Sequence, residues 1–546
     1  MKINFFLVPI DKLRPTYTYA INSPHQSFAT NLFKCLPKKG FNVFVFYQTK
    51  RLLMYLQKPK LSFWQIINMN VGFFGIQYSF GLQQSAVNPI YDFLGAKPDE
   101  IPLLNLAGPL TGLIIQPIIG ALSDKTWHPK YGRRKPYFLI GAILCSLALF
   151  LFPYSSELWM AAGLLWILDV GNNTAMEPYR AFVADKLDAS QQATGFQAQS
   201  FFTGFGQTLA NYSLAIFPVV FVGYSGKLPT WVFASFILGA ICSIGSVLWS
   251  MKTTTEIPPS AEELAEIKKK NEGMPHPVIQ FFLSIITTVI AYVVIALLLI
   301  PSLFVKGLLR KVIQKVESNT KAKVLFAQNI EIIEAITVMP KIMWQLALVY
   351  LFQWYALFCY WQNSAKSIGL SIYNTTPENK EAYEKAVSLA GEVNGWYNIV
   401  TFVTAFALVG FARKFSPKWV HFFCLIIAGI GFIVFPFIEN KTLLFVAITG
   451  FGIGWASMMG IPYLMVVSEI PKERYGVYMG VINMMIVIPM LIQTVTFGYI
   501  LKHLLNNNPG TAILFAGILL LIAALFTMLI KTHKPQNVSL SATASH

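Results

Sequence analysis

One acidic residue lies in the middle of a long apolar segment of this sequence. The segment at 157–184 contains Asp169, and Asn173, Glu177 and Arg180 follow it. A helix turns by about 100° per residue, so these four side chains fall within about 80° of one direction. A charge at the centre of a membrane-spanning helix costs about 2.5–3.5 kcal/mol, so such residues are rare and usually functional. We expect this face to line a polar interior and Asp169 to take up and release a proton; a structural polar network is the alternative.

Arg180 follows Asp169 by eleven positions, which is about 16 Å along a helix axis. That separation is too long for direct pairing. Glu177 lies one turn before Arg180 and is its natural local partner. For Glu177, a role in ligand binding and a purely local ion pair are both open.

Neutral amides and aromatic rings recur in the other apolar segments. Amides donate and accept hydrogen bonds, which suits a polyhydroxylated ligand, and flat rings pack against the apolar face of a sugar. Besides Arg180, Asn173 and Glu177, the candidate ligand-binding residues are Gln77, Gln83, Gln197, Gln207, Trp354, Tyr355 and Trp361. Hydrogen bonds between helices are the alternative for the amides, and an aromatic belt at the membrane interface is the alternative for Tyr360 and Trp361.

The loop GALSDKTWHPKYGRRKP, at residues 120–136, concentrates charge between two apolar segments. We expect its carboxylate and cations to lock the ends of two helices together in one state and to release them in another. A basic loop that only sets membrane orientation is the alternative. The candidate gating residues of this loop, with their expected partners after span four and in the second half, are Asp124, Gly132, Arg133, Arg134, Asp185, Arg413 and Glu469.

The composition requires a membrane environment. Of the 546 residues, 55% are hydrophobic and 12% are charged, whereas soluble domains carry roughly 25% charged residues. This excludes an ordinary soluble enzyme, a disordered protein and a nucleic-acid-binding domain. The net charge of +17 is concentrated at the N-terminus, where residues 1–60 hold ten Lys/Arg and one acid. The five cysteines and seven histidines are dispersed, so we expect no metal, no catalytic site and no cofactor.

Twelve apolar segments are near or above the roughly 20 residues that span a bilayer as a helix. They lie at 62–85, 101–123, 136–153, 157–184, 193–222, 230–250, 342–363, 393–412, 420–438, 441–467, 476–500 and 511–530. Basic loops after the second and eighth spans place both termini in the cytoplasm. We predict an all-α polytopic membrane protein, multi-pass in the plasma (inner, cytoplasmic) membrane.

The spans form two groups of six around a central connection. We divide the chain into a basic N-terminal tail (1–60), a six-helix half (61–250), the connection (251–341), a second six-helix half (342–531) and a C-terminal tail (532–546). An over-extended gene start, with a native start at Met54, and a disordered tail are both open for the N-terminus. The apolar segment 278–306 is expected to form a hairpin or a helix in the interface plane, with both ends cytoplasmic.

The two halves show weak internal similarity. Pro178-Tyr179 aligns with Pro462-Tyr463 at an offset of 284, and Gly120 aligns with Gly410 at an offset of 290. Two nearly equal offsets favour a duplicated transporter over chance resemblance between apolar helices.

Several motifs resemble a known family. The 120–136 loop resembles the span two–three signature of the major facilitator superfamily. The motifs GIQYSFGLQ, IIQPIIGALSD, YGRRKPY and LDVGNNTAMEPYRAFVAD resemble the sucrose transporters among the glycoside–pentoside–hexuronide:cation symporters, over about 60–530 and most strongly over 62–200. The resemblance implies that Asp169 couples protons and that Arg180 binds substrate and balances its charge. Asn363 and Lys366 replace a charged pattern of plant relatives, and Glu177 stands where they have an uncharged residue.

The combined expectation is a secondary active sugar:H+ symporter that works by alternating access within a major facilitator 6+6 bundle. The substrate would be a disaccharide or glucoside such as sucrose or maltose, and the partners would be the sugar, the proton and the lipid bilayer. We expect a monomer that does not bind nucleic acid. The alternatives are a cation-coupled exporter of another small metabolite, a polytopic membrane enzyme and a non-transporting sugar sensor. Na+ coupling would need carboxylates beyond Asp169 and Glu177.

Overall fold

The computed structural model describes residue 58, residues 60–272, 276–304, 308–318, 326, 330, 334–466 and 475–530. The described residues from 60 to 530 belong to one compact unit. The predicted C-terminal tail and almost all of the predicted N-terminal tail lie outside the described residues.

The first half consists of long helices that follow the predicted spans. Its elements are α3 (Phe63–Phe93), α4 (Ile101–Leu104), α5 (Ala107–Asp124), α6 (Lys135–Leu151), η2 (Phe152–Tyr154), α7 (Leu158–Lys186), α8 (Ala189–Val220), β1 (Tyr224–Ser225), β2 (Leu228–Pro229) and α9 (Thr230–Thr253). A capping box starts α3, where the Ser62 hydroxyl accepts from the Gln65 backbone N–H and the Gln65 side chain accepts from the Ser62 N–H. This satisfies two of the backbone donors that a helix start leaves free.

The second half repeats this arrangement. Its elements are α14 (Lys341–Tyr373), α15 (Lys380–Phe415), α16 (Pro417–Val434), η3 (Phe435–Phe437), α17 (Lys441–Val466), α18 (Tyr475–His503) and α19 (Pro509–Thr527). The predicted spans 342–363 and 393–412 are too short, because α14 continues to Tyr373 and α15 already begins at Lys380. The early turns of α15 are polar and capped by the Asn379 side chain, so a search for apolar segments does not detect them.

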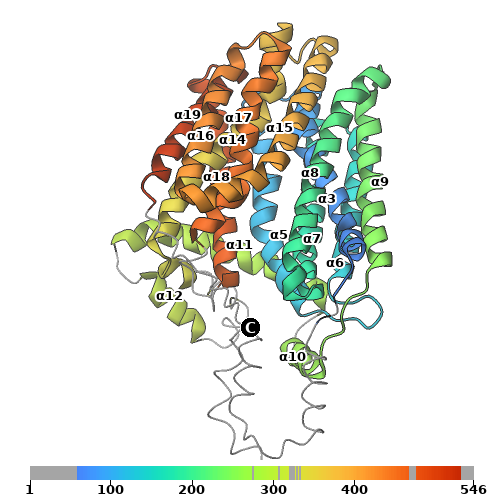
Figure 1. Ribbon diagram of the computed structural model, residues 1–546, viewed down its shortest axis with the longest axis vertical. Helices are drawn as coiled ribbons and strands as arrows, with labels where there is room; N and C mark the ends of the chain where they lie inside the picture. The colour runs from blue at the N-terminus through green and yellow to red at the C-terminus, as the bar shows by residue number, and fades with distance from the viewer. Residues whose placement is uncertain are drawn as a thin grey trace, which may run out of the picture. The chain divides into compact units, whose positions relative to one another are not determined.

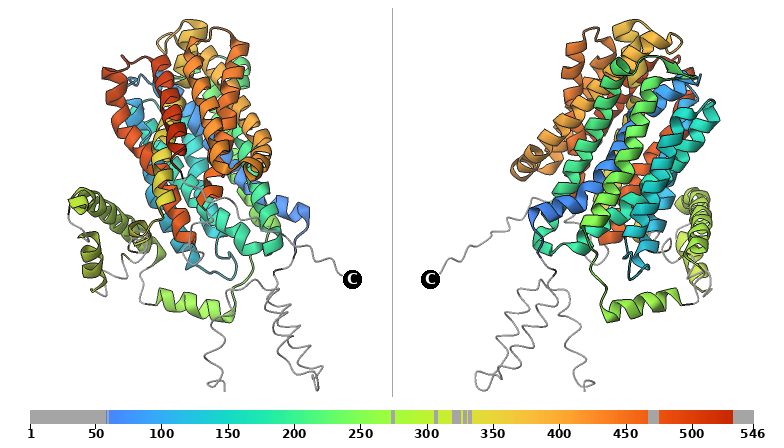
Figure 2. Two further views of the ribbon diagram at one scale, coloured as in Figure 1. Left: turned by 60° about the vertical axis from the view of Figure 1, so that its left-hand side comes forward. Right: turned by 90° about the vertical axis from the view of Figure 1, so that its right-hand side faces the viewer.

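The internal repeat is visible in the backbone. A 3-10 turn follows α6 at Phe152–Tyr154, and another follows α16 at Phe435–Phe437. Each has proline as its middle residue. In the first half α3 packs against α8 and α9, and in the second α14 packs against α18 and α19. Figures 1 and 2 show the two six-helix groups, blue to green and yellow to red, side by side.

Eight helical stretches of the described chain are long and apolar enough to cross a membrane. Four further helices, α3, α7, α8 and α15, have similar or greater length. They hold buried amides such as Gln77, Asn173, Gln207 and Asn394. These four helices therefore contribute polar groups to the interior of the bundle. The expected all-α multi-pass fold is confirmed.

The described residues of the central connection include the helices α10 (Ala261–Asn271), α11 (Pro277–Phe304) and α12 (Leu308–Glu317). The hairpin alternative for 278–306 is wrong, because α11 is one continuous helix. Phe281, Ile285 and Tyr292 pack on the apolar side of α5, and the Tyr292 hydroxyl donates to the Leu113 carbonyl at 3.3 Å. An orientation in the membrane interface stays a prediction for this helix.

Small residues let α6 and α7 approach closely. A Cβ on Gly141 would lie 2.6 Å from the Gly171 carbonyl oxygen and 2.7 Å from Ala175. Backbone atoms cannot move aside as a flexible side chain can, and small residues at such crossings are typical of membrane helices. The opposite face of α6 points outward, and its residues Ile140, Ile143 and Leu147 are about half exposed. This exposed apolar stripe fits contact with lipid.

Gly141→Val is expected to lower the thermal stability of the solubilised protein and its folded yield. Overpacking of this kind costs about 1–3 kcal/mol or more. Thermal unfolding measures the stability, and the amount of protein that elutes as a monodisperse peak measures the folded yield. Gly163→Ala is the matched control, because a Cβ at Gly163 of α7 meets nothing within 4 Å. Equal stability of the two variants would contradict the tight crossing of α6 and α7.

Candidate functional site

Asp169 lies deep in the first half, where α3, α5 and α7 meet. Its side chain is 1% exposed. Gln83 Nε2 of α3 donates to Asp169 Oδ1 at 2.9 Å, while the other oxygen, Oδ2, has no hydrogen-bond partner among the described residues. Gly108 of α5 lies beside this oxygen, since a Cβ on it would lie 3.8 Å from Oδ2, an ordinary van der Waals distance. Asp169 is therefore a buried carboxyl group with one oxygen free to bind a proton or ligand.

A chain of amides extends from α7 to the second half. Asn173 Nδ2 donates to Thr111 Oγ1 at 3.0 Å, and Gln116 Nε2 donates to Asn173 Oδ1 at 2.6 Å. Asn483 Nδ2 of α18 then donates to Gln116 Oε1 at 3.1 Å. Asn173 also donates to the Asp169 backbone oxygen at 2.9 Å. The chain thus connects the backbone of Asp169 with a helix of the opposite half.

The other predicted amides have different environments. Gln207 Nε2 donates to Gln77 Oε1 at 3.0 Å, and both residues are buried between α8 and α3. This contact fits the alternative of a helix–helix hydrogen bond. Gln197 is exposed near the start of α8, so the structure does not bring it together with Asp169.

The predicted polar face of α7 divides into a buried part and an exposed part. Arg180 Nη1 lies 3.7 Å from Glu177 Oε2, and their side chains are 48% and 38% exposed. Asp169 and Asn173, by contrast, are almost fully buried. Arg180 and Glu177 therefore form a solvated local pair, which contributes little stability by itself.

Aromatic residues of the second half form a cluster. Trp455 of α17 makes edge contacts with Trp354 and Trp361 of α14, with ring centroids 5.5 and 5.6 Å apart. Trp361 Nε1 donates to the Tyr397 hydroxyl at 3.3 Å. Each ring is at most 9% exposed. Trp455 lies in an apolar segment that reads as ordinary core, so the sequence gives no signal for its place in this cluster.

The burial of Tyr360 and Trp361 tests whether they belong to an aromatic belt at the membrane interface. Tyr360 is fully buried and stacks on Phe432 with centroids 4.5 Å apart. The interface-belt alternative is wrong for Tyr360 and for Trp361, because a belt residue must reach the lipid headgroups. Tyr355 packs between helices, and its hydroxyl lies 2.8 Å from Thr496 Oγ1.

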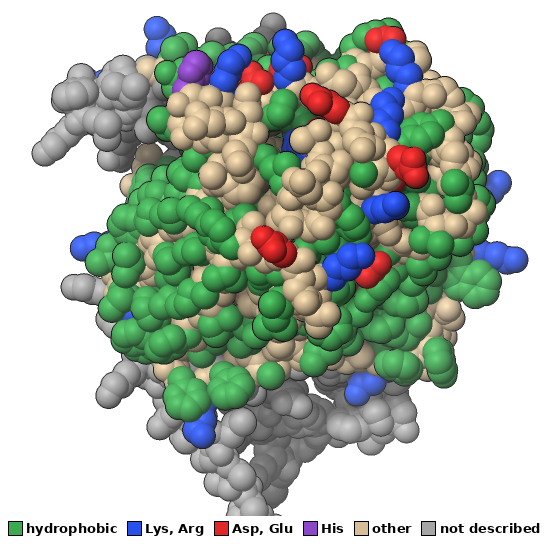
Figure 3. All heavy atoms as spheres, turned by 90° about the horizontal axis from the view of Figure 1, so that it is seen from above, with side chains coloured by type: hydrophobic (Ala, Val, Ile, Leu, Met, Phe, Trp, Pro, Cys, Tyr) green, Lys and Arg blue, Asp and Glu red, His purple; other side chains and the backbone are tan. Residues whose placement is uncertain are grey.

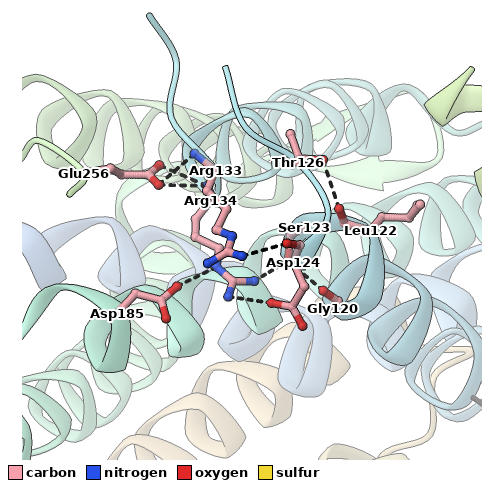
Figure 4. Close-up of polar contacts among 9 residues, drawn as sticks. All are labelled: Gly120, Leu122, Ser123, Asp124, Thr126, Arg133, Arg134, Asp185 and Glu256. Carbon is pink, nitrogen blue, oxygen red and sulfur yellow. Dashed lines mark hydrogen bonds and ion pairs between the residues drawn. The ribbon is translucent and has the colours of Figure 1, made fainter. Parts of the chain in front are cut away.

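The charged loop forms a cluster around Arg134, drawn in Figure 4. Its guanidinium lies 2.6 Å from Asp124 Oδ1 and 2.8 Å from Asp185 Oδ2, and it donates to the Ser123 hydroxyl. Burial alone would lower the pKa of Arg134, but the carboxylates of Asp185 and Asp124 outweigh it and raise this pKa. The guanidinium therefore keeps its charge and ties the end of α5 to the end of α7.

Glu256 holds the same loop from the other side, as Figure 4 also shows. Its carboxylate accepts from the backbone N–H groups of Arg133, Arg134 and Lys135 at 2.8, 3.0 and 2.9 Å. Negative charge is favourable at this position, the start of α6. Gly132, with φ +80°, lies against Glu256, and a Cβ there would meet the carboxylate. Glu256 was not predicted, because nothing local links it to a loop more than 120 residues earlier.

Two predicted gating residues lie in the second half. The side chain of Arg413 and the whole of Glu469 lie outside the described residues. Within the described ranges, no group of three or more His, Cys, Asp or Glu side chains could hold a metal ion.

Comparison with known proteins assigns the fold to a family. The sequence profile of the Major Facilitator Superfamily matches residues 69–494. The chain belongs to the Major Facilitator Superfamily. It is thus an integral multi-pass membrane protein of a transporter superfamily. Among solved structures of the fold, the nucleoside transporter NupG matches with a TM-score of 0.59 and 12% identity over 85% of this chain and 99% of that one. The xylose transporter XylE from E. coli matches with a TM-score of 0.54 and 13% identity, over 87% and 99%.

The related sequences include sucrose transport proteins of plants. SUT5 of Oryza sativa subsp. indica is 23% identical over 478 residues. The matched region covers 78% of the present chain and 79% of SUT5. SUC4 of Arabidopsis thaliana is 23% identical over 467 residues, with 78% and 81% covered. SUC3 of Arabidopsis thaliana is 29% identical over 179 residues, with 29% and 28% covered. The resemblance to sucrose transporters is confirmed.

Proposed function

We propose that this protein is a sugar:H+ symporter that works by alternating access. The observation that carries the proposal is Asp169, a carboxyl group 1% exposed in the middle of α7, one oxygen of which has no partner in the part of the chain that the structure describes. A buried carboxylate without a counter-charge is costly, so the group needs a proton or a compensating ligand in this state. Proton binding and release there would couple the proton gradient to transport.

Two observations support a sugar as the substrate. The relatives that match most of the chain are named sucrose transport proteins. The interior also carries amides and aromatic rings, the side-chain types that bind sugars. Arg180 and Gln83 are the residues we propose to contact the sugar on the side of the first half, and Trp354 and Trp361 on the side of the second. The proton is the coupling ion, and the working unit is a monomer with both termini cytoplasmic.

Uptake into proteoliposomes tests the proposal. Purified protein is reconstituted and offered labelled sucrose, maltose and a glucoside, each with an imposed pH gradient, with an imposed Na+ gradient and without a gradient. We expect accumulation of at least one sugar only with the pH gradient. Accumulation driven by Na+ would contradict proton coupling. Failure of every sugar to enter or exchange, with folded protein in the vesicles, would contradict sugar transport.

A further inference from the structure

A buried ion pair joins the two six-helix halves at the end of the bundle opposite the basic loops. Lys366 Nζ of α14 lies 3.4 Å from Asp92 Oδ1 at the end of α3, and their side chains are 5% and 3% exposed. The hydroxyl of Tyr383, near the start of α15, donates to Asp92 Oδ2 at 2.7 Å. Tyr383 is itself fully buried. Both oxygens of Asp92 are thus bound by residues of the opposite half.

Further contacts close the same end. Asn88 Nδ2 of α3 donates to the Trp361 backbone oxygen at 3.3 Å. Asn394 Nδ2 of α15 donates to Ser85 Oγ at 3.1 Å. Figure 3 views this end and shows acidic and basic side chains close together on a polar surface, with hydrophobic side chains along much of the edge. The halves are therefore in contact here, and the ion pair lies inside that contact.

The physics of a buried ion pair makes this contact depend on both charges. Removing an ion from water costs several kcal/mol, and the attraction between the ions offsets this cost only while both partners are in place. Because Asp92 and Lys366 belong to different halves, separating the halves at this end would expose both charges to water. With both charges in place, the closed and open states therefore have similar free energies. A single unpaired charge would strongly disfavour the closed state.

We propose that Asp92, Lys366 and Tyr383 form a lock that holds the halves together at this end and opens to admit substrate from that side. The lock rests on the proposed alternating access. In the closed state Tyr383 satisfies the second oxygen of Asp92, which keeps water out of the pair. In the open state water replaces Lys366 and Tyr383 as partners of Asp92. Lys366, a departure from the plant pattern in the sequence, thus has a specific partner on α3.

Distances between two spin labels at this end test the lock. Lys97→Cys and Glu378→Cys place the labels on exposed positions of the first and second halves. The full-length protein is measured by double electron–electron resonance in nanodiscs. The protein without the two cysteine substitutions gives the background labelling. We expect Asp92→Asn and Lys366→Met each to shift the distribution toward longer distances. The double variant Asp92→Asn/Lys366→Met is expected to return toward the parent distribution, because no charge is then left unpaired.

The pair Lys502–Asp99 provides a matched control. It lies 3.2 Å apart between the same two halves, but the side chains are 54% and 19% exposed. Lys502→Gln is expected to leave the distance distribution unchanged, because exposed pairs contribute little. A shift as large as that of Asp92→Asn, or an unchanged distribution in the folded single variants, would overturn the lock. If Asp92→Asn does not fold, Tyr383→Phe serves instead, since it removes one hydrogen bond and is expected to give a smaller shift in the same direction.

The distance measurement is independent of sugar uptake. A shift in Asp92→Asn that reverses in the double variant supports the lock even if no tested sugar is transported, in which case the proposed substrate class fails alone. Active sugar uptake with no shift in any variant overturns the lock and leaves the proposed function standing.

Discussion

Asp169→Asn is expected to abolish sugar accumulation driven by a pH gradient. Asparagine has nearly the same shape and keeps an oxygen to accept the 2.9 Å hydrogen bond from Gln83 Nε2, but it cannot bind and release a proton at neutral pH. A pH difference of about one unit stores about 1.4 kcal/mol per proton, enough for about tenfold accumulation. The variant should therefore equilibrate the sugar across the membrane instead of concentrating it.

Exchange of labelled for unlabelled sugar distinguishes lost coupling from lost folding. It needs binding and reorientation but no net proton movement, so Asp169→Asn should retain part of it. Asp169→Glu is the companion variant, because it keeps the carboxyl group but displaces it by one methylene. We expect weak accumulation from it. Accumulation against the gradient by Asp169→Asn would show that another group carries the proton.

Arg134→Lys is expected to impair transport severely and to lower the unfolding temperature. The guanidinium binds Asp124, Asp185 and Ser123 together, at 2.6 to 2.8 Å. A lysine ammonium is a single point of charge and cannot reproduce this fork. Lost hydrogen bonds to charged groups cost about 1.5–3 kcal/mol each. Because Asp124 and Asp185 are 63% and 42% exposed and can be hydrated instead, we expect a total near the lower end of that range.

Arg133→Lys is the matched control for the cluster. The Arg133 guanidinium donates to the Asp124 backbone oxygen at 2.8 Å, and its backbone N–H bond to Glu256 does not depend on the side chain. We expect a small change in uptake and in unfolding temperature. The two are compared by initial uptake rates and thermal unfolding. Equal effects of the two substitutions would contradict the gating role and would favour a loop that only sets the membrane orientation.

The class of protein, the approximate helical spans and the position of Asp169 could be predicted from the amino-acid sequence. These are local properties: the length of an apolar run fixes a span, and a charge inside such a run is costly wherever the helix packs. The 120–136 loop was also detectable, because its charges are concentrated within a few residues. The ends of α14 and α15 were not, since their outer turns are polar and resemble a loop.

The partners of the polar groups, by contrast, depend on how the helices pack. Asp92 and Lys366 lie 274 positions apart, and Glu256 lies 122 positions from the Arg134 backbone that it binds. Neither partner can be chosen from composition or spacing, because the choice depends on how the helices pack. The same packing buries Trp361 and Tyr360 away from lipid and leaves Arg180 partly exposed beside Glu177. A helical sequence defines the faces of each helix, but the neighbouring helices determine which face becomes interior.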